Sequence, residues 1–148
     1  MLSIDPIIRG RDFKNPAEVF DCVAPVLIQK GIVEPGFKER LMQREEEYPT
    51  GLDTESMGIA IPHVGRCMVK KEALAVVICN HPVTFRKMGN PSQKIQVSII
   101  FFPLIKSRQA SFLGMLLNNI RNSDILEKIY NAKDKKQVWQ LLKKSLNI

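Results

Sequence analysis

The sequence has few of the residues that build metal centres and disulfide frameworks. Three cysteines and two histidines are present among 148 residues. Cys22, Cys67 and Cys79 have neither the spacing of a zinc site nor that of a redox pair. An odd number of scattered cysteines is typical of reduced thiols, so we expect a cytoplasmic protein without structural disulfides.

Long hydrophobic runs are also missing. No apolar segment approaches the roughly 20 residues that are needed to cross a bilayer. The longest, residues 97–105, contains Pro103 and is better interpreted as a buried strand. The N-terminus lacks the basic flank and apolar core of a secretion signal. With 45% hydrophobic residues, the chain is expected to form a single domain over residues 1–148 that does not itself span a membrane.

The charge balance is basic, at +7 with a pI near 9.5. Such a balance raises the possibility of nucleic-acid binding. However, the sequence has no zinc-finger spacing and no aromatic-basic pattern of an RNA-binding sheet. The densest basic group has the character of a solvated helix face; it comprises Lys133, Lys135, Lys136, Lys143 and Lys144. The net charge alone does not distinguish a nucleic-acid partner from a protein partner, because an acidic or phosphorylated protein would suit a basic chain equally well. We expect no nucleic-acid partner.

Helix and strand signals alternate along the first two thirds of the chain. Asn15-Pro16-Ala17-Glu18 predicts a helix start, with an Asn cap, Pro at the first helical position and Glu at the third. This helix is expected to run to about Lys30, and Pro25 should kink or split it. A second helix is predicted at residues 37–47. Apolar runs predict strands at residues 3–8, 58–61, 73–79, 82–85 and 95–102.

The last third is predicted to be helical. Phe112, Leu116 and Ile120 belong to an apolar set at helical spacing. Ser123 is expected to cap a short helix, and residues 134–137 form a capping box that opens a final one. The predicted fold class is therefore α/β, a three-layer α/β/α sandwich with a small mixed sheet.

One face of the second predicted helix carries an arginine. Phe37, Leu41, Arg44 and Tyr48 share one stripe, because spacings of three and four residues return to the same face. Arg44 is thus predicted to point with the core-facing residues. The commoner interpretation is a packed aliphatic stem whose guanidinium reaches solvent or a carboxylate. The alternative is that the planar guanidinium of Arg44 binds an anion through its N–H groups. The stripe alone favours the first interpretation.

Pro49-Thr50-Gly51 follows this helix directly. Its simplest interpretation is a rigid turn in which glycine provides backbone freedom. The functional alternative is that the Thr50 hydroxyl and nearby amides bind a phosphoryl oxygen. Taken alone, the segment favours the turn.

His63 is the residue that most needs an explanation. It stands in Pro62-His63-Val64-Gly65, where the apolar run 58–61 ends, and strand ends are where α/β proteins often present reactive groups. Most single histidines are surface or half-buried residues without chemistry. A metal site would need convergent ligands, and a hydrolase would need a nucleophile motif that is missing here. The remaining chemical role is histidine as the nucleophile itself.

Two segments carry a resemblance to a known family: Arg44 to Gly51 and Gly58 to His63. Together they resemble the type 2 enzyme IIA domains, the mannitol/fructose class, of the phosphoenolpyruvate-dependent sugar phosphotransferase system. The resemblance spans nearly the whole chain, and the combination of Pro-Thr-Gly with Pro-His is specific although neither half is specific alone. Within the class, the stretch around Tyr48 is most similar to galactitol-type IIA proteins.

The resemblance implies the mannitol-type IIA fold and a phosphocarrier function. The histidine matching His63 would take a phosphoryl group from phospho-HPr, on Nε2, and pass it to a cysteine of the cognate enzyme IIB. IIB and its membrane partner IIC would then phosphorylate galactitol or a related polyol during uptake. Arg44, Thr50 and Gly51 would line the phosphoryl site. No metal or other cofactor is implied, since the donor is an activated phosphoramidate. The alternative in the same family is a regulatory protein whose phosphorylation controls a transcription factor or kinase.

The chain departs from the family pattern in two respects. Many members carry a second histidine that opens a helix, and the matching position is interpreted as Phe112; His81 is expected to be a surface residue in a turn and not a substitute. HPr docking in the family uses acidic groups on IIA, so a basic chain must concentrate acid locally. We expect an acidic site face formed by Glu45, Glu46, Glu47, Asp53 and Glu55.

Overall fold

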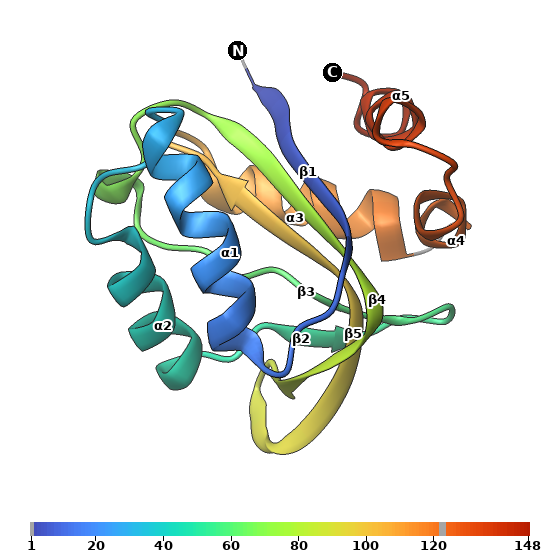
Figure 1. The fold of residues 1–148 in the computed structure, drawn as a ribbon, viewed down its shortest axis with the longest axis horizontal. Coiled ribbons are helices and arrows are strands. Elements are labelled where there is room, and N and C mark those ends of the chain that lie inside the picture. The colour runs from blue at the N-terminus through green and yellow to red at the C-terminus, as the bar shows by residue number, and fades with distance from the viewer. Residues whose placement is uncertain (1, 122–123) are drawn as a thin grey trace.

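The computed structural model describes residues 2–121 and 124–148, and it has the expected α/β architecture (Figure 1). In chain order the elements are β1 (Ser3–Arg11), α1 (Pro16–Gln29), α2 (Phe37–Glu47), β2 (Gly51–Asp53), β3 (Gly58–Ala60), a short 3-10 helix (Arg66–Met68), β4 (Ala73–Lys87), β5 (Asn90–Leu104), α3 (Gln109–Arg121), α4 (Ile125–Tyr130) and α5 (Lys135–Leu146).

The strands of the described residues form one mixed sheet in the order β1-β4-β2-β3-β5, with β4 also paired directly to β5. The long β4–β5 hairpin is antiparallel, whereas β1 runs parallel to β4 and β3 runs parallel to β5. Short β2 pairs antiparallel with β3 and touches the end of β4 at Gly51 and Lys87. The sheet thus brings β3, which leads to His63, beside the central hairpin.

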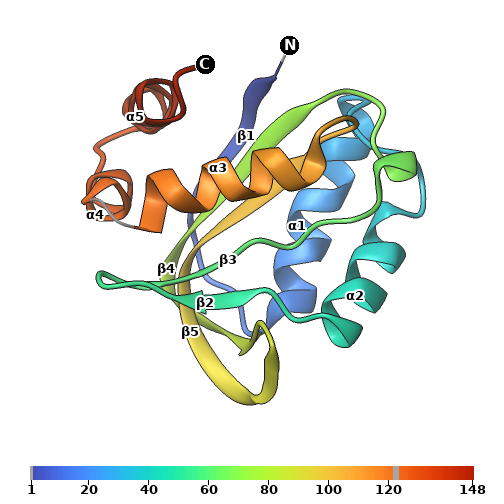
Figure 2. The same cartoon turned by 180° about the vertical axis from the view of Figure 1, so that it is seen from behind.

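Helices cover both faces of this sheet. Along β4, Ala75 and Val77 pack in a core with α1 and α2, while the alternate residues Leu74 and Val76 pack in a second core with α3, α4 and α5. This alternation is the period-two pattern of a strand, and it explains why residues 73–79 are apolar without interruption. Figures 1 and 2 show the two helical layers on opposite sides of the sheet. The three-layer prediction is confirmed.

The helix starts follow from local hydrogen bonding. The Asn15 side chain accepts a hydrogen bond from the Glu18 amide at 2.9 Å, and Glu18 accepts one from the Lys14 amide at 2.8 Å. Asp134 caps α5 in the same manner by accepting from the Gln137 amide. Pro25 was predicted to kink or split this helix; the split does not occur, since α1 continues through Pro25. Ser123, the predicted cap of α4, lies outside the described residues.

Two strand predictions were wrong. The runs 73–79 and 82–85 were predicted as separate strands, yet both belong to β4. The pairing of β4 with β5 is irregular between Ile78 and Val83, so the strand bends there without ending. His81 consequently lies on a strand and not in a turn. Gly51, predicted to belong to the turn Pro49-Thr50-Gly51, begins strand β2 (Gly51–Asp53), which was not predicted. This strand forms because β3 provides a hydrogen-bonding partner that the sequence does not reveal.

Gly58 is required by the close approach of β3 to β5. A Cβ atom at this position would collide with the backbone carbonyl of Gln96, at the register shift between Gly58 and Ile59. By contrast, a Cβ atom on Gly114, in α3, meets open space. The first glycine therefore fixes the position of the strand that leads to His63.

We expect Gly58→Ala to lower the free energy of unfolding by roughly 2–4 kcal/mol, because β3 must move away from β5. Gly114→Ala is the matched control, and it should raise the free energy of unfolding by about 0.5–1 kcal/mol, since glycine weakens a helix interior. Urea denaturation of both variants measures the difference. Equal effects would show that the β3–β5 approach is not tight.

Candidate functional site

His63 stands three residues beyond the end of β3, where the chain leaves the sheet. Its ring is half-buried, and Nδ1 lies 2.8 Å from the carbonyl oxygen of Ile61. Because a carbonyl oxygen only accepts, Nδ1 carries the proton in this hydrogen bond, and in the neutral imidazole Nε2 then keeps its lone pair. The strand end therefore presents an imidazole with a defined tautomer and a free nucleophilic nitrogen.

The backbone on both sides of His63 is fixed by contacts with other elements. The Ile61 amide donates to the carbonyl oxygen of Thr50 at 3.3 Å. The side-chain amide of Gln109, at the start of α3, donates to the carbonyl oxygen of Val64 at 2.8 Å. Sequence reasoning missed Gln109, because a contact across 45 positions leaves no local signal. The loop is thus held on one side by Thr50, which directly precedes β2, and on the other by α3.

Phe112, which was interpreted as the position of the second family histidine, lies one turn further along α3. It packs partly buried against the core that contains α3, α4 and α5. It also lines a pocket with Ile105 and Ile148. The α3 side chain that contacts the His63 loop is instead Gln109.

Arg44 does not point into the core, so the stripe prediction was wrong for its second half. Phe37 and Leu41 are fully buried, but Arg44 is exposed and its guanidinium lies 5.3 Å from the ring centroid of Tyr48. The last turn of α2 extends beyond the core, and the inward line at intervals of four continues from Leu41 to Glu45.

A small pocket connects Arg44 to the His63 loop. It has a volume of about 220 Å³. Its lining includes Arg40 and Arg44 from α2, Gly65 from the loop and Cys67 from the 3-10 helix. Gly65 follows His63 by two residues, so both arginines line a pocket that the segment after His63 also borders. Guanidinium forks suit phosphate geometry. Arg40 was not singled out in the sequence, although its spacing of four from Arg44 places both on one helix face.

Glu45, which is partly buried, and Thr50, which is buried, form a polar pair. Thr50 is only 3% exposed; its amide and its hydroxyl both donate to the Glu45 carboxylate, each at 2.8 Å. The Thr50 hydroxyl is therefore engaged and does not face an open site. Desolvation raises the pKa of Glu45 to about 7, although the two hydrogen bonds from Thr50 and the charge of Arg86 act in the opposite direction.

Gly51 begins β2 directly after Thr50. A Cβ atom here would stand 2.7 Å from the carbonyl oxygen of Arg86 and 3.3 Å from the Ile95 side chain. Glycine is therefore needed for close packing of β2 on the central hairpin. Gly51 supports the site by allowing this approach.

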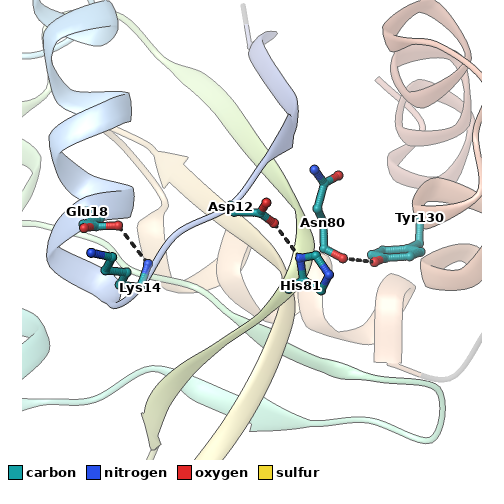
Figure 3. A network of polar contacts seen from close by, with 6 residues as sticks. All are labelled: Asp12, Lys14, Glu18, Asn80, His81 and Tyr130. Atoms are coloured by element: carbon teal, nitrogen blue, oxygen red, sulfur yellow. Dashed lines mark hydrogen bonds and ion pairs between the residues drawn. The ribbon is translucent and has the colours of Figure 1, made fainter.

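The second histidine, His81, lies in a different polar network, which Figure 3 shows. Its Nδ1 lies 2.7 Å from a carboxylate oxygen of Asp12, and its side chain is 82% exposed. The neighbouring Asn80 carbonyl accepts from the Tyr130 hydroxyl. The surface location predicted for His81 is confirmed, and this network shares no residue with the contacts around His63.

The acidic residues near the site do not form a single exposed cluster. Glu46 and Glu47 are exposed, while the Glu45 carboxylate is turned toward Thr50. Glu47 lines the pocket beside Arg40 and Arg44. The acidic site face stays a prediction.

Within the described residues, no group of three or more His, Cys, Asp or Glu side chains is placed to hold a metal ion. None of the helices in the described ranges is both long and apolar enough to cross a membrane.

With this geometry established, comparison with known proteins identifies the family. The model of the phosphoenolpyruvate-dependent sugar phosphotransferase system, EIIA 2, matches residues 1–145. The chain belongs to this family. It is thus a phosphocarrier component of the sugar phosphotransferase system, as the resemblance around Arg44 and His63 indicated.

Individual relatives support the same assignment. The galactitol-specific EIIA component of Escherichia coli K12 is 27% identical over 120 residues, which cover 80% of this IIA domain and 79% of the relative. Among solved structures, the complex of enzyme IIAMTL and phosphorylated enzyme IIBMTL from Escherichia coli aligns with a TM-score of 0.77 at 18% identity, over 96% of this chain and 98% of that one. The nitrogen regulatory protein IIA-Ntr of Neisseria meningitidis gives 0.68 at 22% identity, covering 92% and 91%. Both structures confirm the fold.

The raised pKa of Glu45 predicts a pH dependence of stability in this IIA domain. Between the ordinary value of 4.5 and about 7, the folded protein retains a proton that the unfolded chain releases. This group's contribution is therefore complete below about pH 4.5 and is lost as the pH rises through about 7. At one pKa unit per 1.36 kcal/mol, the loss amounts to about 3 kcal/mol.

Glu45→Gln should remove this dependence, because a neutral amide can keep both hydrogen bonds to Thr50 without burying a charge. Urea denaturation at about pH 5 and about pH 8 measures the change in each protein. Glu39→Gln, on the exposed face of α2, is the control and should follow the wild type. A wild-type pH dependence retained in Glu45→Gln would contradict the assignment of the titration to Glu45.

Proposed function

We propose that His63 is the phosphorylated residue of this IIA domain. It accepts the phosphoryl group of phospho-HPr on Nε2 and transfers it to a cysteine of a cognate enzyme IIB in the cytoplasm. The observation that carries the proposal is the hydrogen bond from Nδ1 to the Ile61 carbonyl, because it leaves the lone pair on Nε2. A nucleophilic imidazole needs this tautomer.

The chemistry consists of two in-line displacements. In the first, the Nε2 lone pair attacks phosphorus while the bond between phosphorus and the HPr nitrogen breaks. In the second, a thiolate of IIB attacks phosphorus and the bond to Nε2 breaks, which returns the lone pair to His63. The proton on Nδ1 stays in its bond to Ile61 throughout. Such transfers depend mainly on placement and charge compensation.

Arg44 is the proposed phosphoryl-binding residue, with Arg40 beside it. Both line the pocket that Gly65 borders, two residues from His63. Their positive charge and fork geometry suit a phosphoryl group at the end of the loop. Thr50 and Gly51 are proposed to support the site from within, since the Thr50 hydroxyl is already bonded to Glu45 and Gly51 packs against β4.

The relatives support the proposed partners and sugar. The galactitol-specific EIIA component at 27% identity supports galactitol, or a related polyol, as the transported substrate. The solved complex of a IIA with a phosphorylated IIB supports a IIB acceptor, through which the membrane component IIC would be served. Phospho-HPr is the donor that the family resemblance implies.

The first experiment is phosphorylation by phosphoenolpyruvate with enzyme I and HPr. Wild type should acquire an acid-labile, base-stable phosphate, and His63→Ala should acquire none, because it lacks the nucleophile. His81→Ala is the matched control, since His81 lies in a separate exposed network, and it should be labelled like the wild type. Label that persists in His63→Ala but disappears in His81→Ala would contradict the proposal.

Arg44→Ala should slow phosphorylation about 10- to 100-fold, because a charge-compensating donor is lost in the transition state. Arg44→Lys should fall between the two, since it retains the charge but not the planar fork. Single-turnover labelling by phospho-HPr measures these rates. Arg121→Ala, at the far end of α3, is the control for the loss of one positive charge. Equal rates in all four proteins would remove Arg44 from the site.

A further inference from the structure

A continuous set of hydrogen bonds connects the end of α2 with His63. Both oxygens of Glu45 accept from Thr50, from its amide and its hydroxyl, at 2.8 Å. The Thr50 carbonyl accepts from the Ile61 amide at 3.3 Å. The Ile61 carbonyl then accepts from Nδ1 of His63 at 2.8 Å. The backbone of Thr50 and that of Ile61 therefore each make one hydrogen bond toward Glu45 and one toward His63.

Glu45 is the only ionisable side chain along this path before His63 is reached, and its position is enforced by the core. It follows Phe37 and Leu41 at intervals of four on the inward line of α2, and both of these residues are fully buried. A helix that is packed this firmly does not shift easily. The Glu45 carboxylate therefore transmits the position of α2 to the backbone of β2.

We propose that Glu45 is a positioning residue for phosphoryl transfer, which holds His63 in its reactive orientation and tautomer through Thr50 and Ile61. The proposal rests on the proposed role of His63. It assigns to Glu45 a function in the reaction without contact to the phosphoryl group.

The physical reason is the cost of leaving Thr50 unsatisfied. Thr50 is 3% exposed, so its amide and hydroxyl have no ready access to water. A buried donor without an acceptor is costly, and the backbone would move to find one. Movement of Thr50 displaces its carbonyl from Ile61, and the Ile61 carbonyl then no longer meets Nδ1. Without this acceptor, the imidazole is free to exchange tautomers and to rotate.

The charged groups around Glu45 come from three elements. Arg86 on β4 and Lys94 on β5 line the same pocket as Glu45 and Glu46 of α2, and α1 contributes only Pro16, Ala17 and Phe20. Arg86 donates to the Glu46 carbonyl at 3.2 Å, so its guanidinium is partly engaged by backbone. The direct partner of the Glu45 carboxylate among the described contacts is Thr50.

The decisive measurement is the tautomer of His63 in the unphosphorylated protein. Two-dimensional ¹H–¹⁵N spectroscopy of the imidazole distinguishes a proton on Nδ1 from one on Nε2. Wild type should show the proton on Nδ1, because the Ile61 carbonyl holds it there. Glu45→Ala should show a mixture of the two tautomers. Glu45→Gln should retain the wild-type pattern, since its amide oxygen accepts from the Thr50 amide and its amide nitrogen donates to the Thr50 hydroxyl.

Single-turnover phosphorylation provides the second readout. Glu45→Ala should slow labelling by about 10-fold or more, because a misplaced nucleophile loses in-line geometry. Glu45→Gln and Thr50→Ser keep the hydrogen bonds and should remain close to the wild type. Thr50→Val loses only the hydroxyl bond and should show a smaller loss than Glu45→Ala. Glu39→Ala, on the exposed side of α2, is the matched control and should behave as the wild type.

Circular dichroism at the assay temperature establishes whether each variant is folded. If Glu45→Ala is unfolded, the labelling rates and tautomers of Thr50→Val and Thr50→Ser are compared in its place. A folded Glu45→Ala with wild-type tautomer and rate would overturn the proposal while leaving phosphorylation of His63 intact. If the wild type itself is not phosphorylated, the proposed function fails, and the tautomer measurement still decides whether Glu45 positions His63.

Discussion

The site depends on the hydrogen bond between Nδ1 of His63 and the Ile61 carbonyl. In the neutral imidazole it favours the tautomer with the proton on Nδ1 and the lone pair on Nε2, and it joins the ring to the backbone that leaves β3. Because the imidazole is held by a carbonyl only two residues away in the chain, its orientation depends on the position of residues 61–63. Much of the surrounding architecture meets this requirement.

Three elements far apart in sequence restrain the His63 loop. β3 is placed by its close approach to β5 at Gly58, α2 holds the start of β2 through Glu45, and α3 reaches the loop through Gln109. Rigid support on several sides agrees with the proposed phosphoryl transfer on His63, which would depend mainly on placement of one nitrogen and compensation of one charged group. The pocket lined by Arg40, Arg44 and Gly65 provides positive charge near the loop, and this charge is not buried, since Arg44 is exposed.

Much of the fold could be predicted because its signals are local. Asn15 and Asp134 cap their helices through bonds within three residues, and α2 was predicted with its observed bounds. The α/β class and the two helical layers followed from periodicity. Errors occurred where pairing decides the structure: β2 exists because β3 lies beside it, and β4 continues through an irregular stretch because β5 supplies partners.

The site divides in the same way. The nucleophile candidate and the family resemblance could be inferred from local motifs, since Pro62-His63 and Arg44 through Gly51 are contiguous segments that resemble the type 2 IIA class. The positions and contacts of the residues around them depend on the tertiary structure. It exposed Arg44, turned Glu45 inward and brought Gln109 to Val64 across 45 positions. Side-chain contacts of this kind depend on where α2 and α3 leave the core, and helical spacing alone does not specify that position.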